Sequence, residues 1–107
     1  SNMAPVVGQQ VTLGPASGPD TLERLALLEE RARVARPREE CDLVVRGVIG
    51  GVRYSALLAD NGMYIDISGG QRPGVELRTA ATQEGNYLTF TCQAPGTGMR
   101  IALDRAR

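Results

Sequence analysis

Residues 41–58 read CDLVVRGVIGGVRYSALL, and this stretch decides the fold. The part before Gly50-Gly51 is rich in β-branched residues, which favour strands. In the part after it, apolar residues alternate with Arg53 and Ser55, and only Leu57 breaks the alternation. Both glycines can adopt the positive φ that a tight hairpin turn requires. The stretch therefore predicts a β-hairpin.

A second turn extends this hairpin into a three-stranded meander over residues 41–68. Asn61-Gly62 is the strongest two-residue turn signal. If the strands continue directly from it, one face of the next strand is apolar and the other is more polar. The apolar face then carries Met63, Ile65 and Ile67, and the more polar face carries Tyr64, Asp66 and Ser68.

Another hairpin is predicted near the end of the chain. Residues 87–92 alternate so that Leu88, Phe90 and Cys92 share one face. The segment Pro95–Gly98 is a turn cluster, and a further alternating run follows over residues 99–103.

Both cysteines fall on apolar faces of the predicted sheet. Cys41 shares a face with Leu43 and Val45, and Cys92 shares one with Phe90. We therefore predict a Cys41–Cys92 disulfide, which would stabilise the fold by about 4 kcal/mol in the chain-entropy model. The alternative is two buried free thiols, which are common in cytosolic proteins.

The first part of the chain predicts an arm followed by a helix. Residues 1–19 form an N-terminal arm or linker with an edge strand at Gln9–Leu13, and residues 20–107 form a single domain. The arm could exchange with a second copy and produce a homodimer.

The helix has start and stop signals in the sequence. Asp20 is a suitable N-cap, and Glu23 three residues later completes a capping box. Pro37 predicts where the helix ends. Its single apolar stripe should cover one face of the sheet. Residues 75–82 fit a strand by alternation or a short helix by composition, and propensity does not decide between them.

The composition excludes several functions. The 107 residues carry 12 basic and 12 acidic side chains, and this balance argues against a nucleic-acid or polybasic membrane surface. Every basic residue is an arginine, so a Schiff-base lysine is excluded; histidine, the usual general base and metal ligand, is also missing. No apolar run approaches the roughly 20 residues that cross a bilayer. Because no signal peptide is visible, we expect a cytosolic chain or, preferably, a domain excised from a longer exported protein.

We expect no enzyme activity, metal or cofactor. A hydrolytic triad would need a base beside its nucleophile, and the chain has no histidine. Nothing indicates that two carboxylates converge in a cleft, as paired acid–base work requires. The candidates for such a pair are Asp42, Asp60, Asp66, Glu76 and Asp104. The oxygens of Asp60, Asn61 and Asp66 could also bind calcium, but their spacing fits no EF-hand loop, so turn formation explains them better.

A small binding surface is the remaining candidate site. Tyr64 and Tyr87 fall on the more polar faces of their predicted strands, and Arg53 and Arg100 are nearby cations. Exposed tyrosines of this kind can contact a protein or a glycan. The alternative is that both tyrosines merely cover the sheet.

Four short segments resemble the end of certain large exported bacterial proteins that carry β-propeller repeats or a di-haem cytochrome region upstream. The segments are CDLVVRG (41–47), TFTC (89–92), PGTG (95–98) and RIALDR (100–105). The opening SNMAPVVGQQVTL is similar to the linker before that terminal domain, which implies that Ser1 and Asn2 are native. The resemblance also implies that residues 75–81 form a short helix.

The resemblance does not extend to ligands. The similar proteins often continue with a calcium-loop-like segment after the last Asp-Arg, whereas this chain ends Asp104-Arg-Ala-Arg107. Haem binding is not implied either, because the Cys-x-x-Cys-His motif is missing.

The predicted fold class is α+β, with an antiparallel sheet of about five strands built from hairpins and one amphipathic helix packed on it. The alternative is a small closed β-barrel with the helix plugging one end. The first functional hypothesis is a non-catalytic accessory domain of an exported multidomain bacterial protein, periplasmic or secreted. The second is a protein- or glycan-binding module, and the third is an enzyme that uses carboxylates. The expected partners are other domains of the parent protein, without nucleic acid or membrane insertion.

Overall fold

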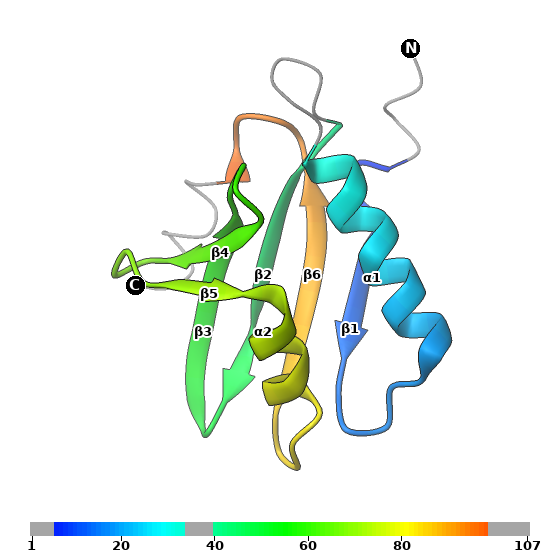
Figure 1. The fold of residues 1–107 in the computed structure, drawn as a ribbon, viewed down its shortest axis with the longest axis vertical. Helices are drawn as coiled ribbons and strands as arrows, with labels where there is room; N and C mark the ends of the chain where they lie inside the picture. Colours follow the sequence, from blue (N-terminus) through cyan, green and yellow to red (C-terminus); the bar gives the residue numbers. More distant parts are fainter. Residues whose placement is uncertain (1–5, 34–39, 99–107) are drawn as a thin grey trace.

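In the computed structural model, which describes residues 6–33 and 40–98, these residues form a six-stranded antiparallel sheet with two helices on one face (Figure 1). The order across the sheet is β1-β6-β2-β3-β4-β5. The predicted α+β class is confirmed, with one more strand and one more helix than the class prediction named. The elements are β1 (Gln10–Leu13), α1 (Pro19–Ala32), β2 (Asp42–Ile49), β3 (Val52–Leu58), β4 (Met63–Asp66), β5 (Gln71–Pro73), α2 (Gly74–Ala81) and β6 (Tyr87–Gln93).

The predicted meander is confirmed. β2 pairs with β3 and β3 pairs with β4, all antiparallel. The turn glycines Gly50 and Gly51 have φ of +61° and +79°, the sign that this hairpin connection requires.

The N-terminal segment belongs to the same sheet. β1 lies at its edge and pairs antiparallel with β6, which confirms the predicted edge strand. Val6, Val11 and Leu13 are buried in the core, so residues 6–13 pack on their own domain. The strand predicted over residues 99–103 lies outside the described residues.

The capping prediction for α1 was wrong. The helix begins at Pro19 with Gly18 as N-cap, and no side chain caps it. Proline suits the first helical position because its missing N–H would have no helical partner there. Asp20 instead lies in the first turn, where its charge still suits the positive end of the helix dipole. The helix ends at Ala32, and the stop predicted at Pro37 lies outside the described residues.

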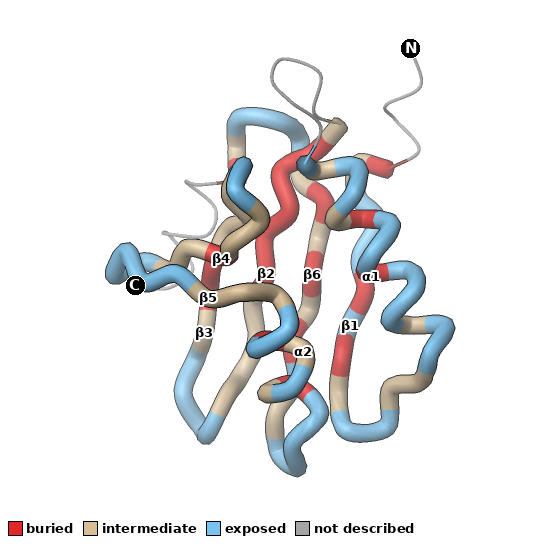
Figure 2. The backbone as a smooth tube through the Cα atoms, in the orientation of Figure 1, coloured by how far each residue is buried: buried red, intermediate tan, exposed pale blue. Residues whose placement is uncertain are grey.

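The core lies between the helices and one face of the sheet. Figure 2 shows the buried positions running along β1, β6 and β2 and along the inner side of α1. Leu25 and Leu28 of α1 and Leu77 and Ala81 of α2 join this core. The helix that the resemblance implied at residues 75–81 is thus present, and its inner face is buried. Of the helices described, neither is long and apolar enough to cross a membrane.

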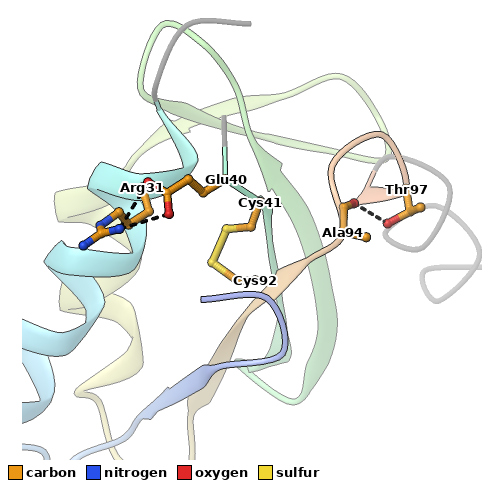
Figure 3. Close-up of a disulfide and its surroundings, with 6 residues drawn as sticks. All are labelled: Arg31, Glu40, Cys41, Cys92, Ala94 and Thr97. Atoms are coloured by element: carbon orange, nitrogen blue, oxygen red, sulfur yellow. Dashed lines mark hydrogen bonds and ion pairs between the residues drawn. A yellow bond between two sulfur atoms is a disulfide. The ribbon is translucent and has the colours of Figure 1, made fainter. Parts of the chain in front are cut away.

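The predicted disulfide is confirmed. Cys41 and Cys92 are bonded, have Cα atoms 5.2 Å apart and are fully buried. The bond joins the start of β2 to the neighbouring strand β6 (Figure 3). Beside it, Arg31 in the last turn of α1 donates to both carboxylate oxygens of Glu40, at 3.0 and 3.1 Å. Helix, strand and disulfide therefore meet at one end of the domain.

The prediction of which face Tyr64 occupies was wrong, because the turn before β4 is one residue longer than expected. The Ala59 N–H donates to the Met63 carbonyl, so Asp60, Asn61 and Gly62 form a three-residue loop. This register pairs Leu58 with Tyr64. A shift of one residue moves every side chain of a strand to the opposite face. Tyr64 is therefore fully buried in the core.

The opposite face of the sheet carries a small apolar patch of its own. Leu57 pairs with Val44 on one side and with Ile65 on the other. Gly98 lies directly over this patch, since an added Cβ would be 2.7 Å from Leu57 Cδ1 and 2.6 Å from Asp42 Cβ. Leu57 breaks the alternation of apolar residues along β3 because it packs in this second apolar patch, and the strand itself is regular at this position.

Candidate functional site

An open groove of about 330 Å³ lies on the sheet and is lined by three adjacent strands. Its residues are Arg46, Gly47 and Val48 of β2, Arg53, Tyr54 and Ser55 of β3, and Tyr87 and Thr89 of β6. Six of them form two rows across the strands, because side chains of paired residues share a face. The rows are Thr89–Arg46–Ser55 and Tyr87–Val48–Arg53.

These rows lie on the face opposite the helices. The core residues Val45 of β2 and Phe90 of β6 alternate with Arg46 and Thr89, and successive strand residues point to opposite faces. Strand alternation therefore separates a hydrophobic face, covered by α1 and α2, from a more polar face that carries the groove.

Two of the four residues predicted as a binding surface meet in this groove. Arg53 and Tyr87 occupy the same row, with Val48 between them, and both are exposed. Tyr64 is buried on the other face and is not part of the groove. Arg100 lies outside the described residues.

The sequence argument missed Arg46 as a groove residue. Arg46 is the central member of the row that joins Thr89 to Ser55. The sequence did contain an indication of this role. Arg46 interrupts the apolar run of β2, and alternation places it on the opposite face of the strand from Leu43 and Val45. What the sequence lacked was the strand order: β6 is far from β2 in the chain but adjacent to it in the sheet.

The groove combines arginine, hydroxyl and aromatic side chains. Among the described residues, the guanidinium groups of Arg46 and Arg53 line it. Guanidinium groups bind carboxylate and phosphate through paired N–H donors. Tyr87, 47 % exposed, adds an aromatic surface at one end. Thr89 is held in position by a 2.8 Å hydrogen bond between its hydroxyl and that of Thr12 in β1.

The predicted calcium candidates serve as turn residues. Asn61 Oδ1 accepts a hydrogen bond from the Met63 N–H at 2.9 Å. Asp66 Oδ1 accepts from the backbone N–H groups of Ser68 and Gly70 and from the Ser68 hydroxyl. The Ser68 hydroxyl is the largest cause that lowers the pKa of Asp66. Within residues 6–33 and 40–98, no group of three or more acidic or cysteine side chains is placed to hold a metal ion.

Asp42 also stabilises a turn. Its Oδ2 accepts hydrogen bonds from the N–H groups of Gly96 and Gly98, both at 2.9 Å. The carboxylate thus fills the concave side of the glycine-rich turn after β6. This contact explains a charged residue that is only 7 % exposed.

A partly buried network connects both helices to the sheet on the core side. The Tyr64 hydroxyl donates to Glu29 Oε2 at 2.6 Å, and Arg78 of α2 donates to Glu29 Oε1. Glu29 therefore receives one neutral and one cationic donor, which compensates its partial burial. Burial raises the pKa of Tyr64 above its ordinary range, and the adjacent Glu29 carboxylate raises it further.

Replacing Tyr64 with phenylalanine should lower the free energy of unfolding by about 2 kcal/mol, because the Glu29 carboxylate loses a buried donor. Tyr54→Phe is the matched control, since the Tyr54 hydroxyl is buried without a partner among the described residues. Its removal should change the free energy by less than about 0.5 kcal/mol or stabilise the domain. Urea unfolding of both variants measures the difference. Equal effects would contradict the network.

The stability of the domain should fall as the pH rises above about 10, the ordinary tyrosine pKa. Tyr64 keeps its proton in the folded state because its pKa is raised, whereas the unfolded chain releases this proton. The unfolded state then binds fewer protons, so the stability is fully present below this pH and is lost above it. Tyr64→Phe should make the urea midpoint less dependent on alkaline pH. An unchanged pH dependence in the variant would contradict this cause.

The fold and groove define a disulfide-linked α+β domain with an open groove, lined by two arginines, on its sheet. A scan against protein-family models, a search of curated proteins and a search of solved structures each found no match.

Proposed function

We propose that this chain is a non-catalytic accessory domain of a larger exported bacterial protein, working in the periplasm or outside the cell. The observation that carries the proposal is the Cys41–Cys92 disulfide in the core. Disulfides form and persist in oxidising compartments and are rare in the cytosol. The resemblance to terminal domains of exported proteins supports the same location. The homodimer predicted through the N-terminal arm stays a prediction, which size-exclusion chromatography with light scattering would measure.

The test is a count of free thiols in the chain produced in the periplasm and in the cytoplasm of a bacterial host. Each sample is unfolded without reductant, alkylated and weighed by mass spectrometry. We expect no label on the periplasmic product and cooperative unfolding at a higher urea concentration than for the reduced cytoplasmic product. Two labels on the periplasmic product, or equal stability of both products, would contradict an extracytoplasmic role.

The groove favours a second function, that of a protein- or glycan-binding module. Arg46, Arg53 and Tyr87 gather there from three strands, on the face that the helices leave uncovered. Solvent-accessible aromatic and arginine side chains in a concave site are typical of recognition surfaces.

An array of glycans and peptides tests this second function. Binding should be lost in Tyr87→Ala and kept in Arg24→Gln, because Arg24 is an exposed residue of α1. If both variants bind as the unmodified chain does, the groove is not the binding site.

A further inference from the structure

We propose that Asn61 is a site of spontaneous covalent modification: it deamidates in the folded domain through attack of the Gly62 nitrogen, and the isoaspartyl product destabilises the packing of β4. Asn61 lies in the loop Asp60–Gly62, which connects β3 to β4. None of the described residues that line the groove belongs to this loop, so the modification is separate from any binding function of the groove.

The reaction needs no enzyme and no cofactor. The Gly62 nitrogen forms a bond to Asn61 Cγ, and the bond between Cγ and Nδ2 breaks. The proton that Gly62 gives up leaves with the amide nitrogen as ammonia, and a cyclic succinimide remains. Water then opens the ring at either of its two carbonyl carbons. One opening gives an aspartate at position 61, and the other gives an isoaspartyl linkage, in which the main chain runs through Cβ and Cγ.

The first support is the residue that follows Asn61. Asparagine is a thermolabile residue, and Asn61 is the one asparagine in the sequence that precedes a glycine. Glycine has no side chain to shield its nitrogen, and it reaches backbone conformations that other residues avoid. Gly62 adopts one of these, with φ of +86°. Asn61 is also exposed, so solvent reaches the reacting atoms.

The second support is the conformation of the Asn61 side chain. Its Oδ1 accepts a hydrogen bond from the Met63 N–H at 2.9 Å. Such an Asx turn folds the side-chain amide back over the peptide bond between Asn61 and Gly62. The Met63 N–H also stabilises the negative charge that develops on Oδ1 during the attack, as backbone donors do in an oxyanion hole.

Two hydrogen bonds oppose the reaction without preventing it. The Gly62 N–H donates to the Ala59 carbonyl at 2.9 Å and has to be released before the nitrogen attacks. Releasing one backbone hydrogen bond of ordinary net strength slows a reaction by about tenfold. The Asn61 Nδ2 donates to Gln71 Oε1 at 3.4 Å, a long and weak contact. The loop therefore delays the loss of the amide and does not block it.

The isoaspartyl product affects the core because this loop sets the register of β4. Its linkage adds a carbon atom to the main chain immediately before β4. That strand carries Tyr64, which is fully buried and donates to Glu29 at 2.6 Å. A longer loop strains this position. An ordinary aspartate keeps the loop length and still offers an oxygen to the Met63 N–H, so it should leave the fold unchanged.

The first experiment ages the oxidised chain in mildly alkaline buffer and follows each asparagine by peptide mass spectrometry. Asn86 is the internal control, because Tyr87 follows it and both ends of its amide are held. Its Oδ1 accepts from the Gly50 N–H at 2.9 Å, and its Nδ2 donates to the Ala80 carbonyl at 2.8 Å. We expect Asn61 to convert about tenfold or more faster than Asn86, with aspartyl and isoaspartyl products.

A sample unfolded in urea shows what the fold contributes. If Asn61 stays intact in the folded chain and converts only in the unfolded sample, the fold protects it and the proposal is wrong. Equal rates at Asn61 and Asn86 in the folded chain would also overturn it. Asn61→Gln should stop the modification at this position, because glutamine would have to close a larger ring.

The second experiment measures the effect of the product on stability. Aged chain is separated by ion exchange, and its isoaspartyl fraction is compared with Asn61→Asp in urea unfolding. We expect Asn61→Asp to keep the urea midpoint of the fresh chain and the isoaspartyl fraction to unfold at a lower urea concentration. If both unfold at the midpoint of the fresh chain, the modification has no effect on β4, and that part of the proposal is wrong.

Discussion

Replacing Gly47 with alanine is expected to lower the free energy of unfolding by about 3 kcal/mol, at the upper end of the usual cost of overpacking. Gly47 lies in β2 directly opposite Leu88 of β6, in the middle of the sheet. An added Cβ would be 2.1 Å from the Tyr87 carbonyl oxygen and 2.9 Å from Leu88 Cα. Both are backbone atoms, so no side-chain rotation relieves the clash. β6 would have to move away from β2.

Gly14→Ala is the matched control for this prediction. No atom lies within 4 Å of a Cβ added at Gly14, and its φ is not positive. The control should change the free energy of unfolding by less than about 0.5 kcal/mol. Urea unfolding followed by circular dichroism measures both variants. Similar stabilities of Gly47→Ala and Gly14→Ala would show that β2 and β6 separate easily and that the close approach is unimportant.

The same substitution should also affect the groove. Gly47 and Tyr87 both line it, and the glycine allows the Tyr87 backbone to approach β2 closely. Moving β6 outward would carry Tyr87 away from Val48 and Arg53. The requirement for glycine at this position thus links the stability of the sheet to the shape of the candidate site.

Removing the disulfide with the double substitution Cys41→Ala and Cys92→Ala is expected to cost about 4 kcal/mol. The bond closes a loop with a sequence separation of 51 residues, which restricts the unfolded chain strongly. A domain of this size has a total stability of about 5–15 kcal/mol, so the loss is a large fraction of it. Both sulfurs are fully buried, and alanine leaves part of their volume empty.

A reductant provides the control for this second prediction. It should lower the urea midpoint of the unmodified chain toward that of the double variant. The double variant itself should unfold at the same urea concentration with and without reductant. If reduction leaves the unmodified chain unchanged, the disulfide contributes little to stability, and the argument for an oxidising compartment loses its physical basis.

Most of the local elements of this protein could be predicted from its sequence, but β5 was missed and propensity left residues 75–82 undecided between strand and helix. The alternation around Gly50-Gly51 predicted β2 and β3, because hairpin turns and strands depend on nearby residues. Cys41 and Cys92 each fall on the apolar face of their predicted strands, and this placement predicted the disulfide. These signals are strong because side chains alternate along a strand with a strict period of two.

The details that depend on register and strand order could be seen only in the folded structure. The length of the turn before β4 placed Tyr64 in the core, where local alternation placed it on the more polar face. The position of β6 beside β2 brought Tyr87 next to Val48 and Arg53. Neither follows from local patterns. One extra loop residue moves the side chains of the following strand to the opposite face of the sheet, and the pairing of strands far apart in the sequence depends on the packing of the whole domain. Most of the elements could therefore be predicted from the chain, whereas the groove exists only where three strands meet.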